Sequence, residues 1–309
     1  MTMDREPAVR IANAPVSYAA FERTIGLPGV PTADAVLTAV AEAGYDGIDL
    51  GPVGYLGRGD GLRRALTARG LGLAGGYVEL PLSDPGRLHD AWGELDAVLD
   101  QFDAATNGSY PPPRPTLAHA PTPEREAHPG QAARDPSIRL SPVAWPGFIA
   151  GVAEALDRCR GRGYEPTFHP ELGTLVEAQV EIDALLEATD IGLCLDTGHL
   201  LAAGGDPVAV VGRWADRINQ VHVKDARLER MAEIVKRNES VDAVWSGDVF
   251  CPLGDGDLDL PGVLEALRTK GYRGWIVVEQ DSLPGDAGAF EATKHAQEEN
   301  RRVLQRLGY

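Results

Sequence analysis

Residues 191–200 read IGLCLDTGHL, an apolar run that ends in an acid, a hydroxyl, a glycine and an imidazole. The apolar part lacks the strict alternation of a half-exposed strand, which predicts a strand buried on both faces. An Asp directly after such a strand is usually a helix cap or a turn residue. In some folds, however, strand ends carry the chemistry, so the rest of the chain decides between the two interpretations.

The same kind of run recurs along the chain. The candidate strands are residues 9–13, 45–50, 71–78, 115–120, 165–169, 191–196, 218–223 and 274–279. Helical patterns separate them at residues 32–44, 60–70, 84–102, 144–163, 176–189, 206–217, 260–271 and 288–308. Alternating strands and helices predict parallel strands joined by crossovers. Eight such units favour an α/β fold of the closed (β/α)8 TIM-barrel type, with a doubly wound open sheet as the alternative.

Two segments interrupt this alternation within what we expect to be a single TIM-barrel domain over residues 1–309. Residues 106–146 are rich in proline and polar residues, which predicts a long loop before the fourth helix. Residues 226–252 form an insertion between the seventh strand and its helix. The insertion contains a helical pattern and is expected to cover one mouth of the barrel. A lid and a passive insertion or subunit contact are equally compatible with it.

Composition narrows the class of partner. The net charge of −17 argues against a large interface with nucleic acid and against an anionic membrane surface. The three cysteines include no CxxC pair, and no apolar run approaches the roughly 20 residues of a membrane span. With no signal-peptide pattern at the N-terminus, we expect a cytoplasmic protein with a small-molecule substrate. The sequence allows a homo-oligomer but does not determine the oligomeric state.

Polar side chains gather where the last four predicted strands end. They are His169 and Glu171, then Asp196 and His199, then His222, Lys224 and Asp225, and finally Glu279, Gln280 and Asp281. The carboxyl ends of parallel barrel strands share one face, where barrel enzymes place their catalytic groups. Imidazoles and carboxylates without a thiolate suit Mn²⁺, Mg²⁺, Co²⁺ or catalytic Zn²⁺. Any one of these residues is most often a cap or a satisfied polar group, and we expect Asp225 and Asp281 to be turn or cap residues. Their coincidence at successive strands favours a metal site.

Several stretches resemble a known family. They are residues 193–207 (LCLDTGHLLAAGGDP), 220–227 (QVHVKDAR), 250–267 (FCPLGDGDLDLPGVLEAL) and 271–281 (GYRGWIVVEQD), supported by 168–174 and 44–57. Together they resemble the xylose-isomerase-like barrels of sugar isomerases and epimerases, and most closely the inosose dehydratase branch. The resemblance covers most of the barrel but does not reach residues 106–146 or 228–248.

The resemblance implies one divalent cation, most readily Mn²⁺, bound by Asp196, His222, Glu279 and one residue of the stretch HPELGT. Many relatives carry a Glu two residues before a His at the end of the fifth strand. This chain has the reverse order, His169 followed by Glu171. Position in the sequence favours His169 as the ligand and residue type favours Glu171, and the sequence leaves this choice open.

The resemblance also implies a metal-dependent isomerase, epimerase or dehydratase that acts on an inosose or related keto-sugar through an enediolate. A metal ion polarises a carbonyl, and a base must reach the neighbouring C–H group. Glu171 is the candidate base if it is not a ligand, and His199 and Lys224 are candidate proton donors. Thr197 and Gly198 are expected to form a turn that returns His199 to the barrel mouth. Tyr55, His199 and Arg227 are the candidate substrate contacts.

Three other functions remain as alternatives. The first is β-elimination of 3-keto-glycosides, which uses the same enediolate. The second is an endonuclease-like enzyme, which the net charge of −17 argues against. The third is a non-catalytic sugar-binding subunit, which would be expected to lack some of the ligands. Specificity belongs to the loops at 51–61, 106–146 and 228–252, where the resemblance is thinnest.

Overall fold

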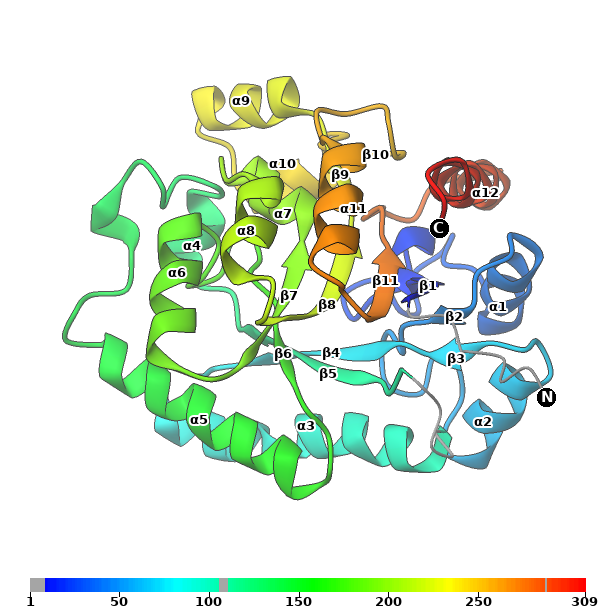
Figure 1. The fold of residues 1–309 in the computed structure, drawn as a ribbon, viewed down its shortest axis with the longest axis horizontal. Coiled ribbons are helices and arrows are strands. Elements are labelled where there is room, and N and C mark those ends of the chain that lie inside the picture. Colours follow the sequence, from blue (N-terminus) through cyan, green and yellow to red (C-terminus); the bar gives the residue numbers. More distant parts are fainter. Residues whose placement is uncertain (1–8, 106–110, 287) are drawn as a thin grey trace.

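A parallel sheet forms the centre of the computed structural model, which describes residues 9–105, 111–286 and 288–309 (Figure 1). Its strands are β1 (Val9–Asn13), β2 (Gly47–Ile48), β3 (Gly72–Leu73), β4 (Gly75–Leu80), β5 (Arg114–His119), β6 (Thr167–Phe168), β7 (Gly192–Asp196), β8 (Ile218–Val223) and β11 (Gly274–Val278). They follow the order β3-β2-β1-β11-β8-β7-β6-β5-β4. Residues 106–110, the start of the loop predicted at 106–146, lie outside the described residues.

The two ends of this sheet are halves of one extended segment. β3 pairs with β2, β4 pairs with β5, and only Ala74 separates β3 from β4. The Leu50 N–H donates to the Gly75 carbonyl at 2.9 Å, which joins the second strand unit to the third. The sheet therefore closes into an eight-unit barrel, and the TIM-barrel prediction is confirmed.

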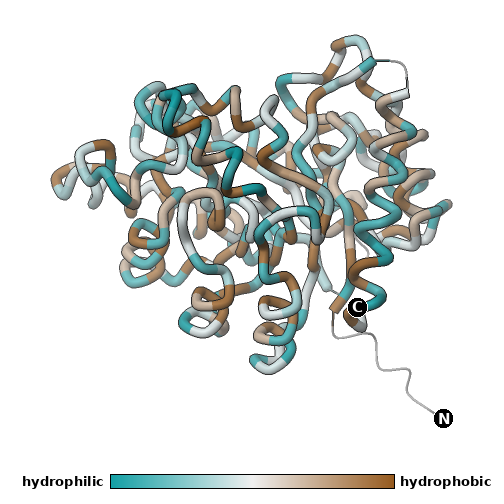
Figure 2. Tube along the Cα trace, turned by 90° about the horizontal axis from the view of Figure 1, so that it is seen from above, coloured by the Kyte–Doolittle hydropathy of each residue, from teal (hydrophilic) through white to brown (hydrophobic). Residues whose placement is uncertain are grey.

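Each predicted helix is present, with small differences in its ends. These helices are α1 (Ala33–Glu42), α2 (Asp60–Thr67), α3 (Pro85–Ala105), α5 (Trp145–Gly161), α6 (Gln179–Ala188), α8 (Pro207–Trp214), α11 (Leu260–Thr269) and α12 (Ala289–Arg306). They surround the sheet, and hydrophobic and hydrophilic residues alternate along them (Figure 2). Such alternation directs one face of each helix toward the barrel and leaves the other for solvent.

Shorter elements lie in the connections. They are the 3-10 helices η1 (Pro15–Tyr18) and η2 (Pro136–Ile138), the α-helices α4 (Pro123–Ala127), α7 (Thr197–Ala202), α9 (Leu228–Arg237) and α10 (Val241–Ser246), and the antiparallel pair β9 (Asp225–Ala226) and β10 (Phe250–Cys251). The prediction of a turn at Thr197 and Gly198 was wrong, because both residues begin α7. No described helix is long and apolar enough to cross a membrane.

Two layers of packing hold the barrel. The larger hydrophobic cluster lies between strands and helices, and Leu193 and Leu195 of β7 belong to it. Inside the barrel, Trp275 of β11 is 2% exposed and packs near its amino-terminal end against Gly47 and Gly72. The opposite, carboxyl end carries the inserted elements α9 and α10 beyond β7 and β8 (Figure 1). Trp275 therefore fills the barrel near its amino-terminal end, and α9 and α10 lie over part of the carboxyl end.

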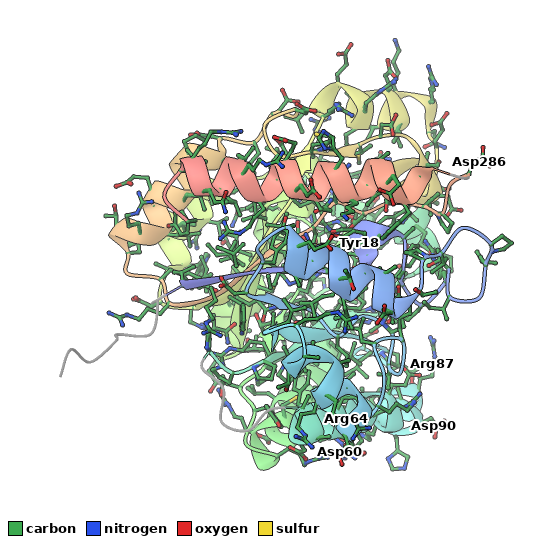
Figure 3. All side chains as sticks on the ribbon, turned by 90° about the vertical axis from the view of Figure 1, so that its right-hand side faces the viewer. Tyr18, Asp60, Arg64, Arg87, Asp90 and Asp286 are labelled. Carbon is green, nitrogen blue, oxygen red and sulfur yellow. The ribbon has the colours of Figure 1, made fainter. Side chains whose placement is uncertain are left out.

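The C-terminal helix closes the side of the molecule. α12 runs across the surface above Tyr18 of η1 (Figure 3). The rings of Tyr18 and Phe290 lie 6.0 Å apart between centroids, and the Asn13 amide donates to the Gln297 side chain at 2.9 Å. These contacts join the last helix to the first strand unit.

The packing around Trp275 predicts a difference between two glycine substitutions. A Cβ at Gly47 would lie 2.7 Å from the Trp275 ring and 2.8 Å from the Gly72 carbonyl oxygen, whereas a Cβ at Gly61 of α2 meets nothing within 4 Å. Gly47→Ala is expected to lower the free energy of unfolding by about 1–3 kcal/mol. Gly61→Ala should leave it unchanged or raise it by up to about 1 kcal/mol. Urea denaturation of both variants checks this, and equal stability of the two would contradict it.

Candidate functional site

Four buried side chains meet at the carboxyl end of the barrel. They are His169 after β6, Asp196 at the end of β7, His222 in β8 and Glu279 after β11. One nitrogen or oxygen atom from each lies within 4.8 Å of the corresponding atoms of the other three. Their strands are consecutive neighbours in the sheet, and Asp196 is the register partner of His222. Strand order alone therefore brings these four side chains together.

Three atoms of this set lack hydrogen-bond partners. His169 Nε2 lies 3.4 Å from Asp196 Oδ2, and His222 Nδ1 lies 3.2 Å from Glu279 Oε2. His169 Nδ1, His222 Nδ1 and Asp196 Oδ2 are buried and make no hydrogen bond. Buried polar atoms nearly always have a partner, so these orphaned atoms need an explanation. A cation fits them, because two imidazoles and two carboxylates are a common donor set for divalent metals.

Asp196 serves two purposes with its two oxygen atoms. Oδ1 accepts a hydrogen bond from the His199 N–H at 2.8 Å and caps helix α7. Oδ2 faces the imidazole of His169 and is one of the orphaned atoms. The cap and the metal-ligand interpretations of the stretch CLDTGH therefore apply to different atoms of the same carboxylate.

Glu171 lies beside the four-residue set but outside it. Strand β6 ends at Phe168, so the two-residue alternation that would align Glu171 with His169 no longer holds. Its Oε2 lies 3.7 Å from His169 Nδ1 and accepts a hydrogen bond from the Tyr77 hydroxyl. Burial, reinforced by the Glu79 carboxylate, raises the pKa of Glu171 to about 8. The geometry thus places His169, and not Glu171, among the atoms that could share one ion.

Lys224 is a buried cation at the edge of the set. Its Nζ lies 2.8 Å from Asp281 Oδ2, 3.1 Å from Glu279 Oε2 and 3.3 Å from Asp196 Oδ2. Burial alone would lower the pKa of Lys224, but these three carboxylates hold it well above its usual value. The expectation that Asp281 is a turn or cap residue was wrong, because its carboxylate is the nearest partner of this ammonium group.

His199 lines the same cavity as Lys224, and its imidazole is neutral. Burial, together with the nearby Lys224 ammonium, holds the pKa of His199 well below its usual value. Its Nδ1 accepts a hydrogen bond from the Leu172 N–H at 3.4 Å, which leaves the hydrogen on Nε2, 3.6 Å from Asp281 Oδ2. His199 can therefore donate a hydrogen bond into the site.

Three predicted residues lie elsewhere. Tyr55 does not line the cavity at this end of the barrel, because its hydroxyl donates to the Pro31 carbonyl at 2.9 Å. Arg227 does not line it either, and its guanidinium donates to the Asp248 carbonyl at 3.2 Å. Asp225 accepts backbone N–H groups of the loop that leads into α11, as a turn residue should.

Sequence reasoning missed Asp49, which follows β2 at the same face. It is 4% exposed, its Oδ1 has no hydrogen-bond partner, and its Oδ2 lies 3.9 Å from His222 Nε2. Burial, opposed by His222, raises the pKa of Asp49 to about 7. The strand-end argument applied to the stretch YDGIDL would have found it, as it would have found Tyr77 and Glu79 in the third strand unit.

Most of the ionisable groups at this end of the barrel line one cavity of about 780 Å³, whereas Asp196 lies behind its lining: the lining residues include Asp49, Tyr77, Glu79, His169, Glu171, His199, His222, Lys224, Glu279 and Asp281. Apolar side chains also line it, among them Phe21, Val241 and Trp245. Trp245 of α10 stacks on Phe21 with 6.4 Å between ring centroids and lies 6.0 Å from the His199 ring. The inserted segment at 226–252 therefore supplies part of the cavity wall, next to the ionisable groups.

Comparison with known proteins identifies relatives of the whole chain. The model of the xylose isomerase-like TIM barrel family matches residues 37–306. The chain is 32% identical to the rhizopine catabolism protein MocC of Rhizobium meliloti, over 98% of this chain and 90% of that protein. It is also 32% identical to the inosose dehydratase of Geobacillus kaustophilus strain HTA426, over 96% of both proteins.

A solved structure supports the fold. The probable 3-DHS dehydratase AsbF from Bacillus anthracis superposes with a TM-score of 0.67 over 96% of this chain and 98% of that chain, at 12% sequence identity. Similarity at this level of identity concerns the barrel and not the chemistry.

The two roles of Asp196 predict separate effects of removing its charge. Asn caps helices about as well as Asp, so Asp196→Asn should keep α7 capped while weakening the metal site. Asp206→Asn is the matched control, because Asp206 caps α8 through the Ala209 N–H at 3.1 Å and lies outside the four-residue set. We expect Mn²⁺ affinity to fall at least 10–100-fold in the first variant and to stay unchanged in the second. Isothermal titration with Mn²⁺ checks this, and equal affinities would contradict it.

Proposed function

The chain belongs to the xylose isomerase-like TIM barrel family, and we propose that it is a divalent-metal-dependent dehydratase of an inosose or a related keto-sugar. Its full-length similarity to inosose dehydratases identifies it as an enzyme. The observation that carries the proposal is the buried set of two imidazoles and two carboxylates on four neighbouring strands. Isomerisation or epimerisation of a keto-sugar would begin with the same proton removal.

His169, Asp196, His222 and Glu279 would hold the ion, with Mn²⁺ preferred and Mg²⁺, Co²⁺ or Zn²⁺ as alternatives. When bound, a divalent cation polarises the substrate carbonyl and stabilises the negative charge that develops on its oxygen. The cavity gives a ligand direct access, because His169, His222 and Glu279 line it.

The remaining charged groups supply proton transfer. Glu171 is a buried carboxylate that lines the cavity, lies outside the four-residue set and is oriented by the Tyr77 hydroxyl. We assign it to take the proton from the carbon next to the carbonyl. The Lys224 ammonium gives a proton to the departing hydroxyl, which leaves as water. One proton is taken and one is given, so the net change is the loss of water from the substrate.

His199 contributes to binding in this proposal. Its Nε2–H faces Asp281 at 3.6 Å, longer than a hydrogen bond, so a substrate hydroxyl has room to accept from it. The rings of Phe250 and Trp245 pack against the imidazole at 5.0 and 6.0 Å between centroids and hold its orientation.

The size of the cavity favours a second candidate function, β-elimination of a 3-keto-glycoside. Pockets of roughly 300–1,000 Å³ hold drug-sized ligands, and about 780 Å³ is generous for a single six-membered ring. Phe21, Val241 and Trp245 would pack against an apolar group carried by the sugar. The chemistry differs only in the leaving group, which is a hydroxyl in one case and a glycosidic oxygen or carbon in the other.

An assay with metal removal tests the proposed function. Enzyme stripped by a chelator and dialysed should not turn over 2-keto-myo-inositol, and added Mn²⁺ should restore formation of the unsaturated product. Turnover of a 3-keto-glycoside but not of the inosose would select the second candidate. Full activity of the stripped enzyme, or no turnover of either substrate with Mn²⁺ present, would contradict the proposal.

The role of Lys224 predicts a specific loss of turnover. Lys224→Met removes the proton donor and the charge but keeps most of the side-chain volume, so kcat should fall about 10²–10⁴-fold. Lys294→Met is the control, because Lys294 forms a comparable 2.8 Å ion pair with Glu42 on the surface, away from the cavity. We expect the control to retain full kcat. Circular dichroism checks that both variants fold, and an unchanged kcat in folded Lys224→Met would exclude this role.

A further inference from the structure

A free thiol lies beneath the four-residue set. Cys194 precedes Asp196 by two residues on β7, so both side chains point to the same face of the strand. Leu193 and Leu195 point the other way and belong to the cluster between strands and helices, to which Cys194 does not belong. Cys194 is completely buried. The thiol therefore occupies the interior of the barrel, one layer below the carboxylate of Asp196.

This thiol completes a second set of ligand atoms. The sulfur of Cys194 and one nitrogen each of His169 and His222 lie within 4.8 Å of one another. The same two imidazoles belong to the upper set, so the two sets overlap. Both rings have an Nδ1 without a hydrogen-bond partner, although the side chains are only 3% and 2% exposed.

Two further orphaned oxygen atoms belong to the strands on either side of β7: that of Gln220 on β8 is level with Cys194, and that of Thr167 on β6 is level with Gly192. Thr167 and Gln220 precede His169 and His222 by two residues, and Gln220 is the register partner of Cys194. Thr167 Oγ1 and Gln220 Oε1 have no hydrogen-bond partner, and both residues are 0% exposed. Fully buried oxygen atoms without partners are rare and need an explanation, such as a bound water or ion. The oxygen atoms of Thr167 and Gln220 do not belong to the four-residue set, so they are an observation separate from its carboxylates.

We propose that the barrel interior holds a second cation position, in which Cys194 with His169 and His222 binds a thiophilic divalent ion such as Zn²⁺ or Cd²⁺. Thiolate and imidazole ligands select such ions, whereas carboxylates favour Mn²⁺ and Mg²⁺. Binding exchanges the thiol hydrogen for the metal, because the coordinating sulfur loses its proton to the buffer. Since both sets need the same imidazoles, an ion in the lower position excludes one in the upper position.

The two ligand sets would therefore prefer different types of metal ion. In this proposal Asp196 and Glu279 would favour a hard ion at the shared imidazoles, and Cys194 would favour a thiophilic ion there. A thiophilic ion in the lower position would leave the two carboxylates without their ion and would displace the metal from the cavity side. This inference concerns ion binding alone and stands whether or not the proposed dehydratase function is correct.

Cadmium absorption spectroscopy tests the proposal, because a thiolate bound to Cd²⁺ produces an ultraviolet charge-transfer band. The full-length protein, stripped of metal and kept reduced, is titrated with Cd²⁺ alone. We expect the band to saturate at one ion per chain and excess Mn²⁺ to weaken the apparent Cd²⁺ affinity. A titration without the band, or a band that Mn²⁺ does not affect, would overturn the proposal.

Single-cysteine variants identify the sulfur. Cys194→Ser should lose the band, and Cys194→Ala serves the same purpose if the serine variant fails to fold. Cys159→Ser and Cys251→Ser should keep it, because these buried thiols of α5 and β10 belong to neither set of ligand atoms. A band that persists in folded Cys194→Ser or Cys194→Ala, or that disappears in either control variant, would assign the sulfur elsewhere and overturn the proposal.

Discussion

Buried negative charge at the carboxyl end of the barrel is the constraint on which the rest of this site depends. Asp196, Glu279 and Asp281 converge on one ammonium group, that of Lys224, within 3.3 Å. Burying unpaired charge costs several kcal/mol per ion, so this arrangement favours a further proton or cation beside the carboxylates, and burial raises the pKa of Asp281 to about 7. Burial alone would lower the pKa of His222, but its buried neighbours Cys194 and Glu279 hold it well above the usual value. The site thus attracts a proton where a cation would bind, and metal binding should release that proton.

The barrel meets this constraint by making the ligands neighbours. The four ligands come from strands that are consecutive in the sheet, namely β6, β7, β8 and β11. Residues far apart in the chain therefore meet at the same end of the barrel. Rigid strands hold the ligands more precisely than loops would. Trp275 closes the other end of the barrel, which leaves the carboxyl end as the entrance.

Much of the fold and of the four-residue set can be predicted from the sequence, because hydrophobic periodicity and the order of strands and helices are visible in short stretches of sequence. Short buried runs and helical patterns give the eight units, and reading strand ends gives the four residues of the set. What failed lies beyond the strand ends, where the two-residue alternation no longer fixes side-chain direction. The candidate substrate contacts Tyr55 and Arg227 failed in this way, because Tyr55 bonds to Pro31 and Arg227 to Asp248 outside the cavity lining. Asp281 was misjudged because its partner Lys224 comes from another strand.

The location of a bound ion tests the central claim most directly. Crystals soaked in Mn²⁺ and measured at its absorption edge should show one strong anomalous peak, about 2.0–2.6 Å from atoms of His169, Asp196, His222 and Glu279. A peak within coordination distance of Glu171 and not of His169 would show that the ligand set is wrong. The absence of any peak at this end of the barrel at saturating Mn²⁺ would contradict a metal centre altogether.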